Sequence, residues 1–129
     1  MRIETKGADG RPNGYVLPIW NSRESEYRPE QVYLTVVKPH CSKGPHLHKK
    51  RTGYFSCIQG NVKVILRTDG QYITHWLGPD DANFPLHVPP GTACEIRNSG
   101  CVPAFLLNMP SPGWASDDQD EWPVEDWNP

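Results

Sequence analysis

The sequence contains little cysteine, no long apolar run and no large excess of either charge. Its four cysteines show no C-x-x-C spacing and are too sparse for a disulfide-stapled scaffold, so we expect reduced thiols, with Cys57 and Cys94 buried in strands. No stretch approaches the roughly 20 apolar residues of a membrane helix, and the first ten residues lack the apolar segment of a secretory signal. The formal net charge is −2 with both signs interspersed, which argues against nucleic-acid and membrane partners. We therefore expect a cytoplasmic protein.

Helix-length patterns of apolar residues at i, i+3, i+4 and i+7 are also missing. Instead, 14 prolines and 11 glycines divide the 129 residues into short pieces rich in β-branched and aromatic side chains. Turn residues at 59–61 and 68–71 separate such pieces. The expected strands are 14–20, 31–37, 54–58, 62–67, 72–77, 86–88, 93–96 and 104–107. Short strands at this spacing predict one all-β domain over residues 1–129, either a closed barrel or a sandwich.

The C-terminal tail, residues 110–129, differs from the rest of the chain because it is acidic, punctuated by proline and rich in tryptophan. Acidic runs are typically solvated or disordered. Its three indoles favour the opposite, since they are costly to leave in water and would pack on the barrel or on a second subunit. A carboxylate of this tail would also be able to orient an imidazole, although the sequence does not indicate which one.

The segment GPHLHKKR carries the clearest chemical signal. If it is extended, His46 and His48 point to the same face, because side chains alternate along a strand. Lys50 shares their parity if the strand continues, whereas Lys49 and Arg51 are expected on the solvated surface. The two imidazoles can therefore share a pocket, as metal ligands or as acid/base groups, or they are ordinary solvent-facing residues at a strand end.

Two motif spacings resemble those of the cupins. The first cupin motif is H-x-H, three or four residues, Glu, six residues and Gly. Here His46 and His48 are followed by four residues, then Gly53 in the place of the Glu, then six residues and Gly60. The resemblance at this motif is therefore one of spacing, with the carboxylate missing.

The second cupin motif is P-x-G, two residues, His, three residues and Asn. Residues 89–91 are followed by two residues, then Cys94 in the place of the His, then three residues and Asn98. The resemblance covers roughly residues 31–108. It implies a cupin-type double-stranded β-helix, which is a small jelly-roll barrel.

Two alternatives follow from the residues that replace the cupin ligands. Two histidines and one cysteine are able to hold zinc or copper, so a metal-dependent cupin, such as a dioxygenase or metal isomerase, would use His46, His48 and Cys94. Gly53, in contrast, has no side chain with which to ligate a metal. The other alternative is a non-catalytic cupin that binds a sugar or nucleotide, because several catalytic residues of cupin-fold enzymes have no counterpart here.

A closer resemblance points to chemistry without metal. The segment KGPHLHKK resembles the R-G-x-H-x-H-K signature of nucleotide-sugar 3,4-ketoisomerases, and its first histidine falls at the base of the dTDP-4-keto-6-deoxysugar 3,5-epimerases. These cupin-fold enzymes work without metal. The resemblance assigns the base to His46, the second active-site histidine to His48 and the sugar-nucleotide contact to Lys43. The epimerase tyrosine acid is missing from AFLLNMP, and Gly53 occupies the place of the epimerase lysine.

We therefore predict an isomerase or epimerase that acts on a nucleotide-linked keto-deoxysugar and needs no metal or other cofactor. Neutral imidazole suits this reaction because its ordinary pKa of about 6.5 allows it to take and return a proton beside the ketone near neutrality. His46 and His48 would carry that proton. Lys43 and Lys50 would offset the diphosphate charge or the developing oxyanion.

Two further residues are expected in the substrate pocket. Tyr33 and Thr35 share a face of the strand that leads toward the histidines, and the matching strand of the related enzymes lines the sugar pocket. Simple core packing explains their alternation equally well. The resemblance, together with the apolar residues of the tail, also implies a homodimer.

Overall fold

The structure, a computed structural model, describes residues 2–82 and 84–129. Among these residues no helix has the length and apolar character needed to cross a bilayer. The elements, in chain order, are β1 (Ile3–Lys6), β2 (Pro12–Val16), β3 (Tyr33–Val37), β4 (Cys41–Leu47), β5 (Gly53–Gln59), β6 (Val62–Thr68), β7 (Gln71–Leu77), the 3-10 turn η1 (Pro79–Asp81), β8 (Leu86–Val88), β9 (Ala93–Asn98), β10 (Ala104–Asn108) and β11 (Trp122–Pro123).

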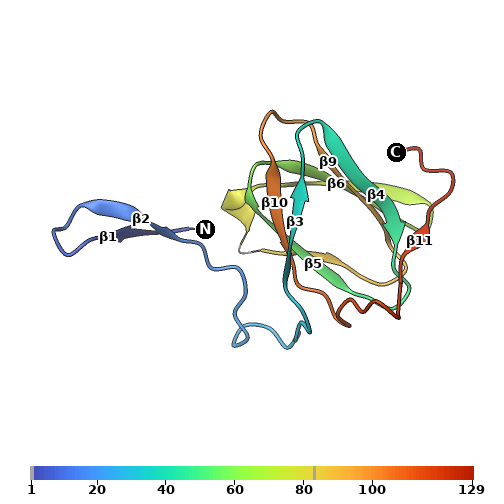
Figure 1. The fold of residues 1–129 in the computed structure, drawn as a ribbon, viewed down its shortest axis with the longest axis horizontal. Coiled ribbons are helices and arrows are strands. Elements are labelled where there is room, and N and C mark those ends of the chain that lie inside the picture. The colour runs from blue at the N-terminus through green and yellow to red at the C-terminus, as the bar shows by residue number, and fades with distance from the viewer. Residues whose placement is uncertain (1, 83) are drawn as a thin grey trace.

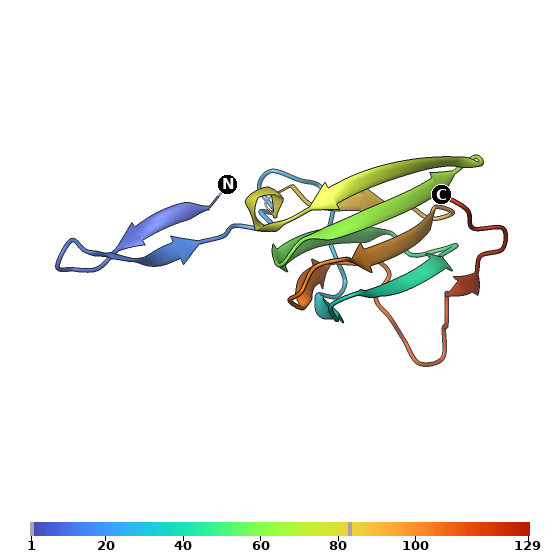
Figure 2. The same cartoon turned by 90° about the horizontal axis from the view of Figure 1, so that it is seen from above.

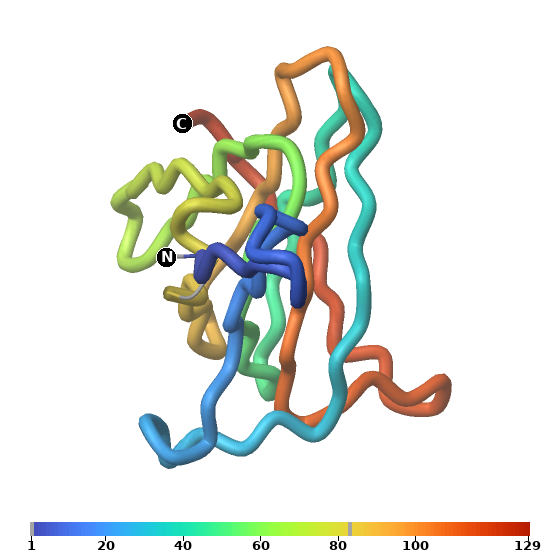
Figure 3. Tube along the Cα trace, turned by 90° about the vertical axis from the view of Figure 1, so that its left-hand side faces the viewer, coloured from blue at the N-terminus to red at the C-terminus, as the bar shows by residue number. Residues whose placement is uncertain are grey.

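Two antiparallel sheets form the body of the molecule (Figure 1). One has the strand order β3-β10-β5-β8 and the other has the order β11-β4-β9-β6-β7. Apart from the β6–β7 hairpin, neighbouring strands in this order come from distant parts of the chain. For example, β3 and β10 run side by side along their full length (Figure 3). This double-sheet arrangement is the jelly roll expected of a cupin, so the all-β prediction is confirmed.

The N-terminal hairpin of β1 and β2 is separate from both sheets and extends away from the body (Figure 2). The expected strand 14–20 is wrong in its second half, because β2 ends at Val16. Pro18 lies just beyond that end, and proline has no N–H to donate to a strand ladder. β1 was not expected; this strand has only four residues, and most of them are exposed.

Alternate side chains of the two sheets meet in one apolar cluster. Cys57 belongs to it and is buried in β5 as expected, whereas Cys94 in β9 is only partly buried. All four cysteines are free. The buried members of the cluster are Val37, Cys57, Val62, Val64, Leu66, Leu77, Val88, Ile96, Ala104 and Leu106.

The tail packs on the barrel, which decides between the two alternatives left open by the sequence. It starts beside β3, where the Trp114 N–H donates to Gln31 Oε1 at 2.8 Å. It then adds β11 to the edge of the second sheet, next to β4. Beyond β11, Trp127 contacts Tyr72 edge-on, with ring centroids 5.1 Å apart. The tail is therefore fixed to the barrel at its beginning, its middle and its end.

Candidate active site

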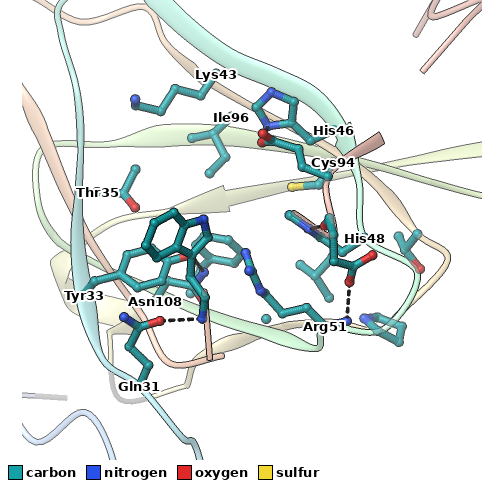
Figure 4. A pocket seen from close by; sticks show the side chains of 18 of the residues that line it. Gln31, Tyr33, Thr35, Lys43, His46, His48, Arg51, Cys94, Ile96 and Asn108 are labelled. Carbon is teal, nitrogen blue, oxygen red and sulfur yellow. Dashed lines mark hydrogen bonds and ion pairs between the residues drawn. The ribbon is translucent and has the colours of Figure 1, made fainter. Parts of the chain in front are cut away.

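A cavity of about 680 Å³ opens between the two sheets, on the side that the tail covers. Strands β3, β4, β5, β9 and β10 provide its walls, and the tail completes them (Figure 4). The lining residues are Gln31, Tyr33, Thr35, Lys43, His46, His48, Arg51, Gly53, Phe55, Val88, Pro89, Thr92, Cys94, Ile96, Asn108, Trp114, Gln119, Asp120 and Glu121.

A bulge in β4 brings Lys43 and His46 to the same wall. Three residues apart, their side chains would point to opposite faces of a regular strand. The pairing with β9 shifts register between them, and an extra residue of this kind reverses the alternation. Gly44 lies in the bulge with φ of 90°, and a Cβ there would come within 2.5 Å of the Cys94 carbonyl oxygen. Only glycine fits this close approach of two strands.

His48 follows β4 and is held by the backbone of the tail. Its Nδ1 lies in a short hydrogen bond with the carbonyl oxygen of Asp120. A carbonyl only accepts, so Nδ1 carries the proton. In the neutral ring Nε2 is therefore the nitrogen that is free to accept a proton.

His46 is held by a side chain of the tail. Its Nδ1 lies 3.0 Å from Glu121 Oε1, and both side chains are about half exposed. A carboxylate that receives the Nδ1–H fixes the tautomer of the ring and leaves Nε2 as the basic nitrogen. The sequence did not indicate which tail carboxylate would orient a histidine; in the structure Glu121 occupies this position beside His46.

Asp120 joins the tail to the turn that follows His48. Its carboxylate accepts hydrogen bonds from the backbone N–H groups of Lys49, Lys50 and Arg51 at 2.8 to 2.9 Å, and from the Trp122 indole at 3.3 Å. Burial by itself raises the pKa of this carboxyl, but these donors outweigh it and lower the pKa to about 2. Asp120 is therefore ionised at neutral pH and fixes the tail to the histidine segment.

The expected substrate-binding residues Tyr33 and Thr35 both line the cavity from β3. The Tyr33 hydroxyl accepts a hydrogen bond from Asn108 Nδ2 at 2.8 Å. Asn108 is buried at the end of β10, and its Oδ1 accepts the N–H of Tyr54 at 3.2 Å. Sequence reasoning missed Asn108, although its even spacing from the buried Ala104 indicated an inward side chain.

The expected positions of Lys50 and Arg51 are both wrong. β4 ends at Leu47, so the alternation that favoured Lys50 does not extend to it. Lys50 is not among the described residues that line the cavity, and its Nζ lies 3.4 Å from Asp118 Oδ1 on the surface. Arg51, expected on the surface, lines the cavity and is only 8% exposed. In Figure 4 its side chain reaches into the middle of the cavity.

The residues at this site do not fit a cupin metal. Cys94 lines the cavity, but burial raises the pKa of its thiol to about 12, with the nearby Glu95 adding to the effect. Metals bind the thiolate, so a metal at Cys94 would have to displace this proton. In the described ranges, no three His, Cys, Asp or Glu side chains are grouped to hold an ion. Gly53 lines the cavity where the cupin carboxylate would stand.

Sequence comparison then places the chain in a family. Residues 3–121 match the family model described as "FdtA: WxcM-like, C-terminal". The chain belongs to this family. The match confirms the resemblance that the histidine motif indicated. A comparison of this sequence with curated proteins found no match.

Solved structures share the fold of this FdtA-family chain. The dTDP sugar isomerase from Desulfovibrio desulfuricans G20 has a TM-score of 0.80 at 20% identity, covering 96% of this chain and 79% of that one. The sugar 3,4-ketoisomerase QdtA from Thermoanaerobacterium thermosaccharolyticum, in complex with TDP, has a TM-score of 0.72 at 22% identity, covering 98% and 88%. The capsular polysaccharide assembling protein CapF from Staphylococcus aureus has a TM-score of 0.69 at 20% identity, covering 75% of this chain but only 29% of CapF. These likenesses show the fold.

Proposed function

We propose that this protein isomerises a nucleotide-linked keto-deoxysugar by proton transfer through His46 and His48, without a metal. The observation that carries the proposal is the tautomer of the two rings: both Nδ1 atoms bond to tail oxygens, which leaves both Nε2 atoms as proton acceptors in one cavity. The family match supports the reaction class. The fold relatives described as a dTDP sugar isomerase and a TDP-bound 3,4-ketoisomerase support the substrate class.

The reaction begins when His46 Nε2 takes the proton from the carbon beside the ketone. The C–H electron pair becomes the C=C bond of an enediolate, and the C=O pair moves to the oxygen. Return of a proton to the former keto carbon, with transfer of the hydroxyl proton between the two oxygens, shifts the ketone to the neighbouring carbon. His48 carries protons between those oxygens. Return to the opposite face of the first carbon would give an epimer instead.

Two lining residues suit the nucleotide part of such a substrate. Lys43 contributes a cation to the wall that bears His46, where it would offset the diphosphate charge. Trp114 is 56% exposed at the cavity, so one face of its indole is available to stack on a base. Tyr33 and Thr35 would contact the sugar.

Proton exchange in D₂O tests the proposal. Metal-stripped protein is incubated with a panel of nucleotide-linked 4-keto-6-deoxysugars, and the ring protons are followed by NMR. We expect exchange beside the ketone, with a loss of about 100-fold or more in His46→Asn and His48→Asn, because general acid/base groups contribute about 10²–10⁴-fold. His40→Asn is the matched control, since His40 is exposed and has φ of 57°, a conformation that asparagine adopts readily.

Other outcomes point to the alternative functions. Exchange that appears only after a metal is added back would overturn metal-free catalysis. Binding of the sugar nucleotides, seen as thermal stabilisation with no exchange under either condition, would make the protein a binding cupin. Exchange that persists in His46→Asn would remove His46 as the base.

A further inference from the structure

Among the described residues, Arg51 is the one buried cation for which the proposed reaction has so far given no role. It is 8% exposed and lines the cavity. Within the described part of the chain, its Nε atom is buried without any hydrogen-bond partner. Burying a guanidinium costs several kcal/mol unless acceptors surround it, so an unpartnered one requires a compensating contact. The cavity is the place where that contact is missing.

The carboxylates that line the cavity do not supply it. Asp120 directs its oxygens to the backbone N–H groups of residues 49–51 and to the Trp122 indole. Glu121 binds His46. Of the five donors on a guanidinium, none is paired with either carboxylate in the described structure. The buried Nε donor of Arg51 is therefore available to an acceptor that a bound molecule brings.

The position of Arg51 relates it to the reacting sugar rather than to the diphosphate. Asp120 holds the Arg51 backbone N–H with its carboxylate and His48 Nδ1 with its carbonyl, so one tail residue positions both. In Figure 4 Lys43, the residue suited to the diphosphate, lies beside His46 at one end of the view of the cavity, whereas His48 and Arg51 lie toward the other end. A substrate whose diphosphate meets Lys43 would thus extend its sugar past the histidines toward Arg51.

We infer that Arg51 is a catalytic residue that donates hydrogen bonds to the keto oxygen of the sugar and stabilises the enediolate. This role rests on the proposed function. When His46 removes the proton, the electron pair of the carbonyl moves to the oxygen, which becomes negative while the ring of His46 becomes positive. A preformed guanidinium at that oxygen stabilises the developing negative charge without reorganising during the reaction. When the proton returns to carbon, the carbonyl forms again and the charge disappears.

The test compares Arg51→Met and Arg51→Lys with the wild-type protein, using TDP-4-keto-6-deoxyglucose for D₂O exchange at saturation and calorimetry for binding. Arg23→Met is the matched control, since Arg23 is exposed and lies outside the cavity. We expect Arg51→Met to lose about 100-fold or more in exchange, as when one oxyanion donor is removed, while Kd changes less than tenfold. Arg51→Lys keeps the charge but lacks the planar guanidinium, so its exchange rate should lie between those of the wild-type protein and Arg51→Met.

Chemical rescue separates catalysis from a structural role. In Arg51→Ala, millimolar guanidinium chloride should restore part of the exchange, whereas sodium chloride at equal ionic strength should not. The absence of rescue in a folded variant would overturn the catalytic role. If the Arg51 side chain only supported the fold, added guanidinium would not restore exchange.

The remaining outcomes distinguish failure of this role from failure of the proposed function. A wild-type protein that exchanges no sugar overturns both. Exchange that Arg51→Met leaves intact overturns the role of Arg51 alone. A loss of affinity for TDP itself in Arg51→Met assigns Arg51 to the diphosphate, and tighter, Arg51-dependent binding of a nucleotide-linked uronic acid than of the matching neutral sugar assigns it to a sugar carboxylate. Either result replaces the catalytic role.

Discussion

The packed core and the cavity are built on the same strands, yet one is filled by apolar side chains and the other is left open. β3 directs Tyr33 and Thr35 to the cavity and Val37 to the core. β10 directs Ala104 and Leu106 to the core, then Asn108 to the cavity. The inward alternation never changes along either strand. What changes is the chemistry of the inward residue, so strand geometry fixes which side chains face inside and residue identity decides whether they pack or leave a site.

The two regions also differ in what closes them. The core is closed by the sheets alone, whereas the cavity depends on the tail, which positions both histidines and the turn between β4 and β5. Substitutions in the core should therefore affect stability first, and substitutions in the tail should affect activity first.

The largest effect on stability is expected in the core. Leu106 has no exposed surface, so Leu106→Ala should lower the free energy of unfolding by about 2–5 kcal/mol through lost burial and the cavity left behind. Urea denaturation followed by tryptophan fluorescence measures the change. Leu34→Ala on the outer face of β3 is the matched control and should cost far less, because Leu34 is 51% exposed. Equal losses in the two variants would contradict the separation of core and surface.

An intermediate effect is expected where the tail meets the barrel. Asp120→Asn removes the negative charge and part of the acceptor set for three backbone N–H groups, so we expect a loss of about 1–3 kcal/mol in stability. His48 should lose its alignment as the tail loosens, and exchange should fall about tenfold. Asp117→Asn, an exposed neighbour, is the control. Unchanged exchange in Asp120→Asn would mean that the tail does not position His48.

Acid denaturation adds a pH signature to the same variant. The pKa of Asp120 is about 2 in the folded protein against an ordinary value of 3.8, so its stabilising contribution is complete above 3.8 and disappears as the pH falls toward 2. Wild-type stability should therefore drop more steeply than that of Asp120→Asn in this window, as measured by thermal unfolding across pH. Parallel curves would show that this carboxylate is not the stabilising group.

The smallest effect is expected from Glu121→Gln. The amide can still contact His46 Nδ1 at the 3.0 Å position, but it no longer carries the charge that favours the protonated ring during the reaction. We expect exchange to fall several-fold, with stability unchanged because both side chains are about half exposed. Glu125→Gln on the same tail is the control. A loss of stability as large as that of Asp120→Asn would assign Glu121 a structural role.

The sequence was sufficient for the features that depend on local alternation and turn chemistry. Most strands of the two sheets, the shared face of Tyr33 and Thr35, and a shared pocket for His46 and His48 were predicted, because a period of two relates neighbours directly. The strands β1, β4 and β11 were not among those expected. Lys43 was placed by its resemblance to a family motif, since the bulge after it reverses the alternation and cannot be read from residue types.

Long-range contacts were not predictable in the same way. Arg51 was expected on the surface as part of a run of cations, but it lines the cavity, and the Asp120 carboxylate that binds its backbone N–H is 69 positions away in the sequence. Glu121 meets His46 across a long stretch of sequence that carries no local sign of the contact. Such pairs follow from the closure of the whole barrel.

The bond between His48 and the Asp120 carbonyl joins residues that are 72 positions apart. During translation the histidines emerge from the ribosome early, and their orienting partners Asp120 and Glu121 emerge only after strands β3 to β10 have been made. A nascent chain can therefore build its folded body while its imidazoles are still free to rotate. The histidines acquire their orientation only when the tail is added to strands that have already been made.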